Sequence, residues 1–190
     1  MKYDEAKDRL DGYRQQIMEI RGAMRKIQSE IEPQRINDYT FKTLEGEQNL
    51  SSLFDGKDDL FVIHNMGTSC PYCTLWADGY NGVYPHLANR AAFVVISPDA
   101  PQTQQKFAAE RGWKFPMLSH QGSTFAQDMG YRSESGGWLP GISVFQRRNG
   151  EIFRVSDLSE GPGDDFCTVW HLFDLLPEGA NGWQPRFNYH

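Results

Sequence analysis

Apolar side chains near the amino terminus recur at alternating spacings of three and four residues, which is a heptad pattern kept over about four heptads. The positions are Tyr3, Ala6, Leu10, Tyr13, Ile17, Ile20, Met24, Ile27 and Ile31. This spacing predicts a long helix over residues 2–32, which Pro33 ends. A helix of about 29 residues is about 43 Å long, more than a small domain is wide. Its apolar seam therefore packs along its own domain or pairs with a second copy as a homodimer.

From Tyr39 onward the pattern predicts alternating strands and helices. In chain order these are a short strand at 39–43 that turns at Gly46, a helical turn at 50–54, a strand at 59–64, a helix at 70–87, a strand at 92–97 and a helix at 101–111. Pro101 is placed to open the last of these helices, and Gly112 to close it. The order strand, helix, strand, helix is typical of a parallel sheet.

The carboxyl-terminal third ends in a hairpin and a helix. After Met117 and Leu118 a short helix is expected through Phe125 and Met129. Two strands, 141–145 and 152–155, flank Asn149-Gly150, a dipeptide typical of a tight hairpin turn. A last helix is predicted over 164–176, before Pro177.

Composition narrows the class of protein. With 190 residues, 39% of them apolar, the chain can form one core domain plus an extension. A net charge of −6 gives no electrostatic reason to expect nucleic acid or anionic lipid as a partner. The longest apolar run, residues 91–96, is too short to span a membrane, and the amino terminus is a charged helix unlike a signal peptide. We expect a cytoplasmic protein whose three cysteines are normally reduced.

The most informative motif is Cys70-Pro71-Tyr72-Cys73, which follows a buried strand at the start of a predicted helix. Unpaired backbone N–H groups and the helix dipole favour a thiolate at Cys70, so Cys70 is the expected nucleophile. Cys73, one turn later, is the expected resolving thiol. Pro71 and Tyr72 are candidate substrate contacts. Two alternatives stay open: half of a zinc site that Cys167 and His171 would complete, or an inert pair of buried cysteines.

Two further positions bear on the site. His64 ends the strand that leads to the motif, and it is either a structural residue or a buried group that takes and returns the proton of Cys73. Pro140 directly precedes the predicted strand at 141–145 and is either an ordinary turn residue or a cis-proline at the site. Trp138 follows a Ser-Gly-Gly loop, where an exposed ring could line a substrate groove.

The order of elements, together with Cys70-Pro-Tyr-Cys73, resembles the thioredoxin superfamily. The resemblance implies that a cis-proline at the position of Pro140 lies against the active disulfide and helps to dock an extended substrate chain. It also places His64 where thioredoxins carry a buried acid.

Almost the whole chain is similar to the bacterial thioredoxin-like family catalogued as domain of unknown function 899. The residues that carry this similarity are Tyr39-Thr-Phe, Leu53-Phe54, Cys70-Pro-x-Cys73, Trp76-Ala-Asp78, Arg111-Gly-Trp113 and Pro140-Gly-Ile-Ser-Val-Phe145. The fold implied is α/β and thioredoxin-like, a central mixed sheet flanked by helices, with peroxiredoxin-like additions at its N-terminal side. We expect a helical extension at 1–33, the thioredoxin-like domain at 34–180 and an aromatic tail at 181–190.

The expected function is that of a thiol:disulfide oxidoreductase without metal or organic cofactor. Cys70 attacks a protein or small-molecule disulfide, Cys73 resolves the intermediate, and Pro140 positions the substrate backbone. One alternative is a thiol peroxidase, although peroxiredoxins carry Thr or Ser three residues before the reactive cysteine and Pro seven before, where this chain has Gly67 and Ile63. The other is a non-enzymatic scaffold, or a dimeric iron–sulfur binder that uses Cys70.

Overall fold

The structure is a computed structural model that describes residues 1–189, and the chain divides into two compact units, Met1–Gln34 and the remainder from Arg35. The first unit consists mainly of α1 (Tyr3–Glu30), so the predicted long helix is confirmed and ends before Pro33. None of its side chains is buried. The apolar seam, from Tyr3 at 82% exposed to Ile31 at 44%, is therefore open along α1.

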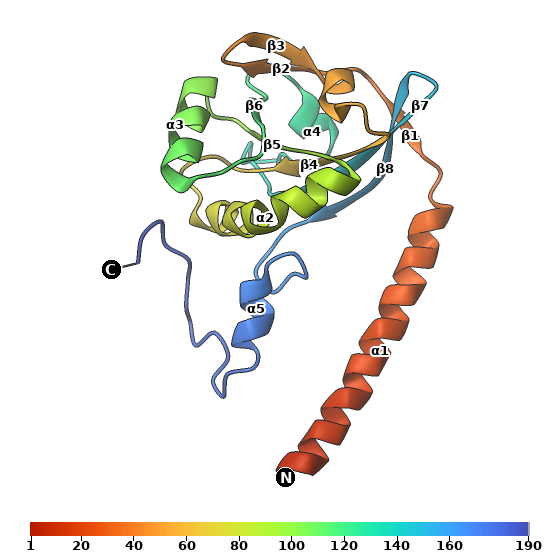
Figure 1. The fold of residues 1–190 in the computed structure, drawn as a ribbon, viewed down its shortest axis with the longest axis vertical. Coiled ribbons are helices and arrows are strands. Elements are labelled where there is room, and N and C mark those ends of the chain that lie inside the picture. The colour runs from red at the N-terminus through yellow and green to blue at the C-terminus, as the bar shows by residue number, and fades with distance from the viewer. Residues whose placement is uncertain (190) are drawn as a thin grey trace. The chain divides into compact units, whose positions relative to one another are not determined.

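The second unit is built on one mixed sheet (Figure 1). Its strands are β1 (Gln34–Ile36), β2 (Thr40–Thr43), β3 (Gly46–Asn49), β4 (Asp59–His64), β5 (Ala92–Ser97), β6 (Met117–Ser119), β7 (Gly141–Arg148) and β8 (Glu151–Ser159). Within the described residues the strand order is β1-β8-β7-β4-β5-β6-β2-β3. β4, β5 and β6 run parallel, as the alternation of strands and helices predicts, and β7 runs antiparallel to β4.

The helices agree with the sequence-based expectations except at the carboxyl-terminal end. They are η1 (Leu50–Phe54), α2 (Pro71–Arg90), α3 (Pro101–Arg111), α4 (Phe125–Asp128) and α5 (Thr168–Phe173). α5 is shorter than the predicted 164–176. The Asp164 carboxylate accepts backbone N–H groups of Gly161, Phe166 and Cys167, which holds the segment before α5 in a turn.

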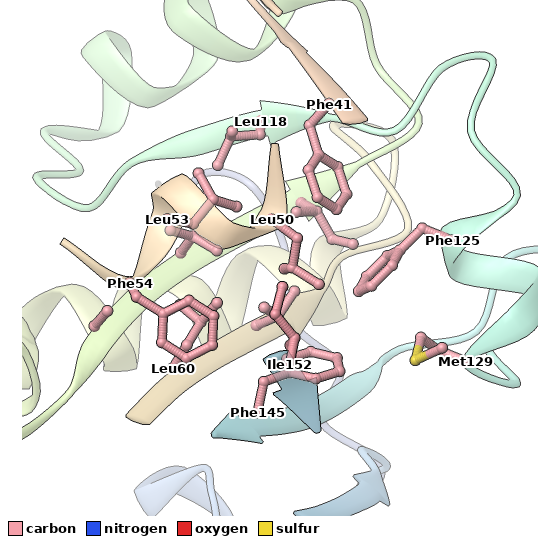
Figure 2. Close-up of a cluster of buried hydrophobic side chains, with 14 of the residues drawn as sticks. Phe41, Leu50, Leu53, Phe54, Leu60, Leu118, Phe125, Met129, Phe145 and Ile152 are labelled. Carbon is pink, nitrogen blue, oxygen red and sulfur yellow. The ribbon is translucent and has the colours of Figure 1, made fainter. Parts of the chain in front are cut away.

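The sheet buries apolar side chains on both faces. On one face, side chains of η1 and α4 meet those of β4, β7 and β8, including Leu50, Phe125 and Phe145 (Figure 2). On the other face α2 packs through Trp76 and Ala77 against β5. Successive residues of a strand point to opposite faces, so in β4 Val62 joins the first cluster and Ile63 the second.

A tight turn and a close approach fix the β7–β8 hairpin. Asn149 and Gly150 both have positive φ, 52° and 82°, as the predicted Asn-Gly turn requires. At Gly141 a Cβ atom would lie 2.2 Å from the Tyr131 ring and 2.4 Å from the Leu158 carbonyl oxygen, so only glycine fits.

The aromatic tail folds back onto the second unit. Trp183 packs edge-on against Trp170 and Phe173, and Phe187 packs against Phe107 of α3. No helix of residues 1–189 is both long and apolar enough to cross a membrane.

Candidate functional site

The loop from β4 to α2 is held by the end of β5. The backbone N–H of Thr68 donates to Asp99 Oδ2 at 2.7 Å. Gly67, with φ +106°, passes so close that a Cβ atom there would lie 2.9 Å from the same oxygen. Asn65 Oδ1 accepts the Gly67 N–H at 2.8 Å. These contacts fix where α2 begins, and therefore where the two cysteines lie.

Cys70 is the N-cap of α2, and its sulfur accepts the backbone N–H of Cys73 at 3.1 Å. The Cys73 thiol also donates to this sulfur, and with the N–H groups of Cys73 and Tyr72 it lowers the pKa of Cys70 to about 7, against the opposing effect of burial. Cys70 is 9% exposed. This lowered pKa favours the thiolate form of Cys70, which is the form that a nucleophile needs.

Cys73 lies on the buried face of α2 and is 3% exposed. Its hydrogen bond to Cys70, burial and the charge of Cys70 all raise its pKa, and the carboxylate of Glu160 raises it further. The Met66 N–H, 3.4 Å from the sulfur, acts in the opposite direction. The two thiols thus differ sharply: Cys70 ionises readily and Cys73 holds its proton.

The placement of His64 contradicts the predicted proton transfer with Cys73. His64 shares the sheet face of Val62, opposite to α2, and its ring stacks on Tyr131 with centroids 3.7 Å apart. Nε2 pairs with Ser143 Oγ at 2.9 Å. Burial, followed by the charges of His120 and Arg154, lowers the pKa of His64 well below its usual value. His64 is a neutral core residue, because alternation along β4 turns Ile63, and not His64, toward α2.

The buried acid on the α2 side is Glu160, a residue that the sequence pattern did not single out. It follows β8 directly, is 7% exposed, and accepts a hydrogen bond from the Tyr80 hydroxyl. Burial raises the pKa of Glu160 to about 7. Glu160 directly precedes Gly161-Pro162-Gly163, a sequence typical of a loop. Only its long-range contact with α2 shows that it belongs to the site.

Pro140 is not the cis-proline that the resemblance to thioredoxins implies. No peptide bond of the described residues is cis, so Leu139–Pro140 is trans. The Pro140 carbonyl accepts the Glu160 N–H at 3.2 Å, which continues the β7–β8 ladder. Gly141, the next residue, pairs with His64, so Pro140 still lies at the edge of the sheet from which the Cys70 loop leaves.

The remaining candidate residues are half-buried. Trp138 is packed between His120, edge-on at 4.5 Å, and the Arg132 guanidinium at 4.6 Å, so its ring is less free than expected. Pro71 is the first residue of α2. Tyr72 faces Trp170, with ring centroids 6.3 Å apart.

A sequence profile described as "Bacterial protein of unknown function (DUF899)" matches residues 5–189. The chain belongs to this family. The similarity predicted from its motifs is thereby confirmed. No curated protein matches the chain.

Three motif residues of this DUF899 protein meet in one cluster. Asp78 of α2 accepts the Trp113 indole N–H at 2.8 Å and the Arg111 Nε–H at 2.9 Å. A second Arg111 nitrogen bonds the other carboxylate oxygen. This pairing joins α2 to the end of α3, so these residues support the helix that carries the cysteines. Among residues 1–189, no group of three or more His, Cys, Asp or Glu is arranged to hold a metal ion.

Solved structures similar to this DUF899 protein include peroxiredoxins. Peroxidoxin BcpB from Mycobacterium tuberculosis has a TM-score of 0.56 and 25% identity, covering 67% of this chain and 84% of that one. The bacterioferritin comigratory protein of Xanthomonas campestris has a TM-score of 0.55 and 16% identity, covering 64% and 80%. Reduced Prx3 from Vibrio vulnificus has a TM-score of 0.55 and 14% identity, covering 70% and 89%. The predicted thioredoxin-like fold is confirmed.

Proposed function

We propose that this protein is a thiol:disulfide oxidoreductase that uses Cys70 and Cys73. The observation that carries the proposal is the asymmetry of the pair. A nucleophile needs a thiolate near neutral pH, and the pKa of Cys70 is about 7. A resolving thiol needs to stay protonated and shielded until a mixed disulfide forms, and Cys73 is buried with a raised pKa.

The reaction transfers two electrons and two protons. The Cys70 thiolate attacks one sulfur of a substrate disulfide, forming a mixed disulfide and releasing one substrate thiolate. Cys73, once deprotonated, attacks the Cys70 sulfur, which forms the Cys70–Cys73 disulfide and releases the second substrate thiol. The oxidised protein returns to its dithiol form by the reverse exchange with an external dithiol. The two sulfurs carry the electrons, so the proposal includes no metal or organic cofactor.

The segment before β7 is the proposed substrate contact. Pro140 and the half-buried Trp138 lie on it, and β7 pairs with β4, whose end leads to Cys70. Pro71 and Tyr72 complete the proposed contact from the start of α2.

A thiol peroxidase is the second candidate, because the similar solved structures include peroxiredoxins. In that reaction the Cys70 thiolate attacks a peroxide oxygen, an alcohol or water leaves, and Cys73 condenses with the resulting sulfenic acid to release water. The same two cysteines serve both reactions, so the choice depends on which substrate Cys70 attacks.

The test compares the two substrates on the reduced full-length protein. We expect a peptide disulfide to be reduced with turnover in the presence of dithiothreitol, and Cys70→Ser to lower the rate at least about a hundredfold. In the absence of dithiothreitol, Cys73→Ser should stop after one attack and hold the substrate covalently, which mass spectrometry detects. Cys167→Ser, at a buried cysteine outside the motif, is the matched control and should retain the parent rate.

Hydrogen peroxide in place of the disulfide separates the candidates. Oxidation of Cys70 by peroxide much faster than by the disulfide would replace the first proposal by the second. A protein that reacts with neither substrate would contradict both, and would favour the scaffold or iron–sulfur alternative.

A further inference from the structure

The resolving step requires Cys73 to be deprotonated inside the protein. This thiol must lose its proton before it attacks. The hydrogen bond to Cys70 and the charge of Cys70 no longer raise its pKa once Cys70 is in the mixed disulfide, but burial still does, and Cys73 is 3% exposed. Burial makes the ionisation of this thiol costly. A group inside the protein that accepts the proton would remove this obstacle.

Glu160 faces the side of α2 on which Cys73 lies. The buried residues of α2 include Cys73, Trp76, Ala77 and Tyr80, which are spaced i, i+3, i+4 and i+7 and so share one helix face. The Tyr80 hydroxyl donates to Glu160 Oε1. The charge of the Glu160 carboxylate also raises the pKa of Cys73, as the weakest of the effects on that thiol. Its backbone N–H is tied to Pro140.

We infer that Glu160 accepts the Cys73 proton during resolution, and that the Tyr80 hydroxyl holds the Glu160 carboxylate in position for this transfer. The inference rests on the proposed function and applies to the second of its two steps. The proton moves from Cys73 sulfur to a carboxylate oxygen, directly or through one water molecule, and the Cys73 thiolate then attacks Cys70. Glu160 next releases the proton to the departing substrate thiolate or to solvent.

The charges around Glu160 suit this role. Burial is the main cause that raises its pKa to about 7, the Tyr80 hydrogen bond lowers it and the Asp164 charge raises it. Near neutral pH both the acid and the carboxylate are therefore populated, so the group can take a proton and return it. Tyr80 has a strongly raised pKa, mainly from burial, and stays a donor. Cys167, at the start of α5, also senses the charge of Glu160 and holds its proton, because burial raises its pKa.

The other titratable groups near Glu160 have hydrogen-bond partners of their own or lie on the opposite face of the sheet. Asp164 accepts the Trp76 indole and the N–H groups of Phe166 and Cys167 on Oδ1, and the Gly161 N–H on Oδ2. His64 lies on the opposite face of the sheet. Among the described contacts, the Glu160 carboxylate accepts no N–H group. Glu160 is thus the carboxylate on the α2 face that is available to take a proton.

An aromatic disulfide, 5,5′-dithiobis(2-nitrobenzoate), separates the two steps by colour. Attack by Cys70 releases one coloured thiolate, and resolution by Cys73 releases the second. This leaving thiolate needs no proton near neutral pH, so the only proton that resolution must remove is that of Cys73. Stopped-flow absorbance on the reduced full-length protein, from about pH 5.5 to 9, records both phases, and Cys73→Ser marks the first alone.

We expect Glu160→Gln to leave the first phase within about twofold of the parent and to slow the second at least about tenfold at pH 8. The parent second phase should rise with a midpoint near the pKa of Glu160, about 7, and Glu160→Gln should lose that midpoint. Tyr80→Phe removes the hydrogen bond that lowers the pKa of Glu160, so its second-phase midpoint should move to higher pH. Glu160→Asp should restore part of the rate.

Asp157→Asn is the matched control, because this exposed carboxylate lies on β8, three residues before Glu160. It should change neither phase. A second phase in Glu160→Gln with the parent rate and pH profile would overturn the inference while leaving the proposed function intact. If Glu160→Gln does not fold, an unshifted midpoint in Tyr80→Phe overturns it equally. A parent protein that releases no second thiolate would overturn the proposed function itself.

Discussion

Glu160 combines two properties in one side chain, a buried carboxyl and a pKa of about 7. The folded state therefore favours the protonated form of Glu160, whereas the same side chain in the unfolded chain has a pKa near 4.5. The stability contributed by this preference is complete below about pH 4.5 and is lost as the pH rises through 7. The loss between pH 5 and 8 amounts to roughly 2 to 3 kcal/mol.

We predict that Glu160→Gln does not show this loss of stability between pH 5 and 8, because the glutamine side chain does not ionise. Urea unfolding at pH 5 and pH 8 should show that the stability of Glu160→Gln, relative to the parent, rises by roughly 2 to 3 kcal/mol between the two pH values. Taking the difference between the two proteins cancels the titration of all other groups. Parallel stability curves for parent and variant would show that Glu160 has an ordinary pKa in the fold.

The sequence could identify the cysteines but not the acid beside them. Cys70 and Cys73 are marked by their spacing and by the strand before them, both of which are local features. The sequence leaves His64 as either a structural residue or a proton-transfer group, because β4 is buried on both sides and its pattern does not show which side α2 covers. Glu160 lies 87 residues after Cys73, and nothing local distinguishes it from a loop residue.

At the scale of the elements, most boundaries could be predicted because proline and glycine mark them. Pro101 and Gly112 bound α3, and Asn149-Gly150 turns the β7–β8 hairpin. The last helix was predicted too long, because the Asp164 hydrogen bonds that delay its start depend on a side-chain arrangement that apolar spacing does not show.

The hairpin element offers a sharp test of packing. Gly141→Ala would place a Cβ atom 2.2 Å from the Tyr131 ring and 2.4 Å from a backbone oxygen, so strand or ring must move. We expect a loss of about 2 to 4 kcal/mol in unfolding free energy, measured by urea denaturation. Gly12→Ala in α1 is the control, since nothing lies within 4 Å of its new Cβ, and it should not destabilise the protein. An equal response of the two variants would contradict the close approach at Gly141.

At the scale of the whole molecule, the sequence predicts the parallel strands at the centre of the sheet but not which strands form its two edges. β2 and β3 join the edge beside β6, while β1 lies at the opposite edge beside β8. Such pairings bring together residues far apart in the chain, and apolar periodicity carries no information about which edges meet. The same limit applies to α1, whose seam the sequence identifies without its partner.

The exposed seam of α1 leads to a prediction about assembly. Its apolar residues stay exposed, among them Ile17 at 46% and Met24 at 61%, and a heptad seam of this length is typical of a helix that pairs with another helix. We expect the full chain to be a homodimer through α1 at micromolar concentration. Sedimentation equilibrium should show the double variant Ile17→Glu/Met24→Glu as a monomer, because charges at two seam positions one heptad apart oppose pairing.

The control for this experiment is Ser29→Glu, which adds a charge to α1 away from the seam and should leave the dimer intact. Thermal unfolding of the double variant separates assembly from folding, since the core domain has its own buried clusters and should keep its midpoint at low protein concentration. A parent protein that is monomeric at all concentrations would show that the seam does not pair with a second copy. A double variant that remains dimeric would place the dimer contact outside α1.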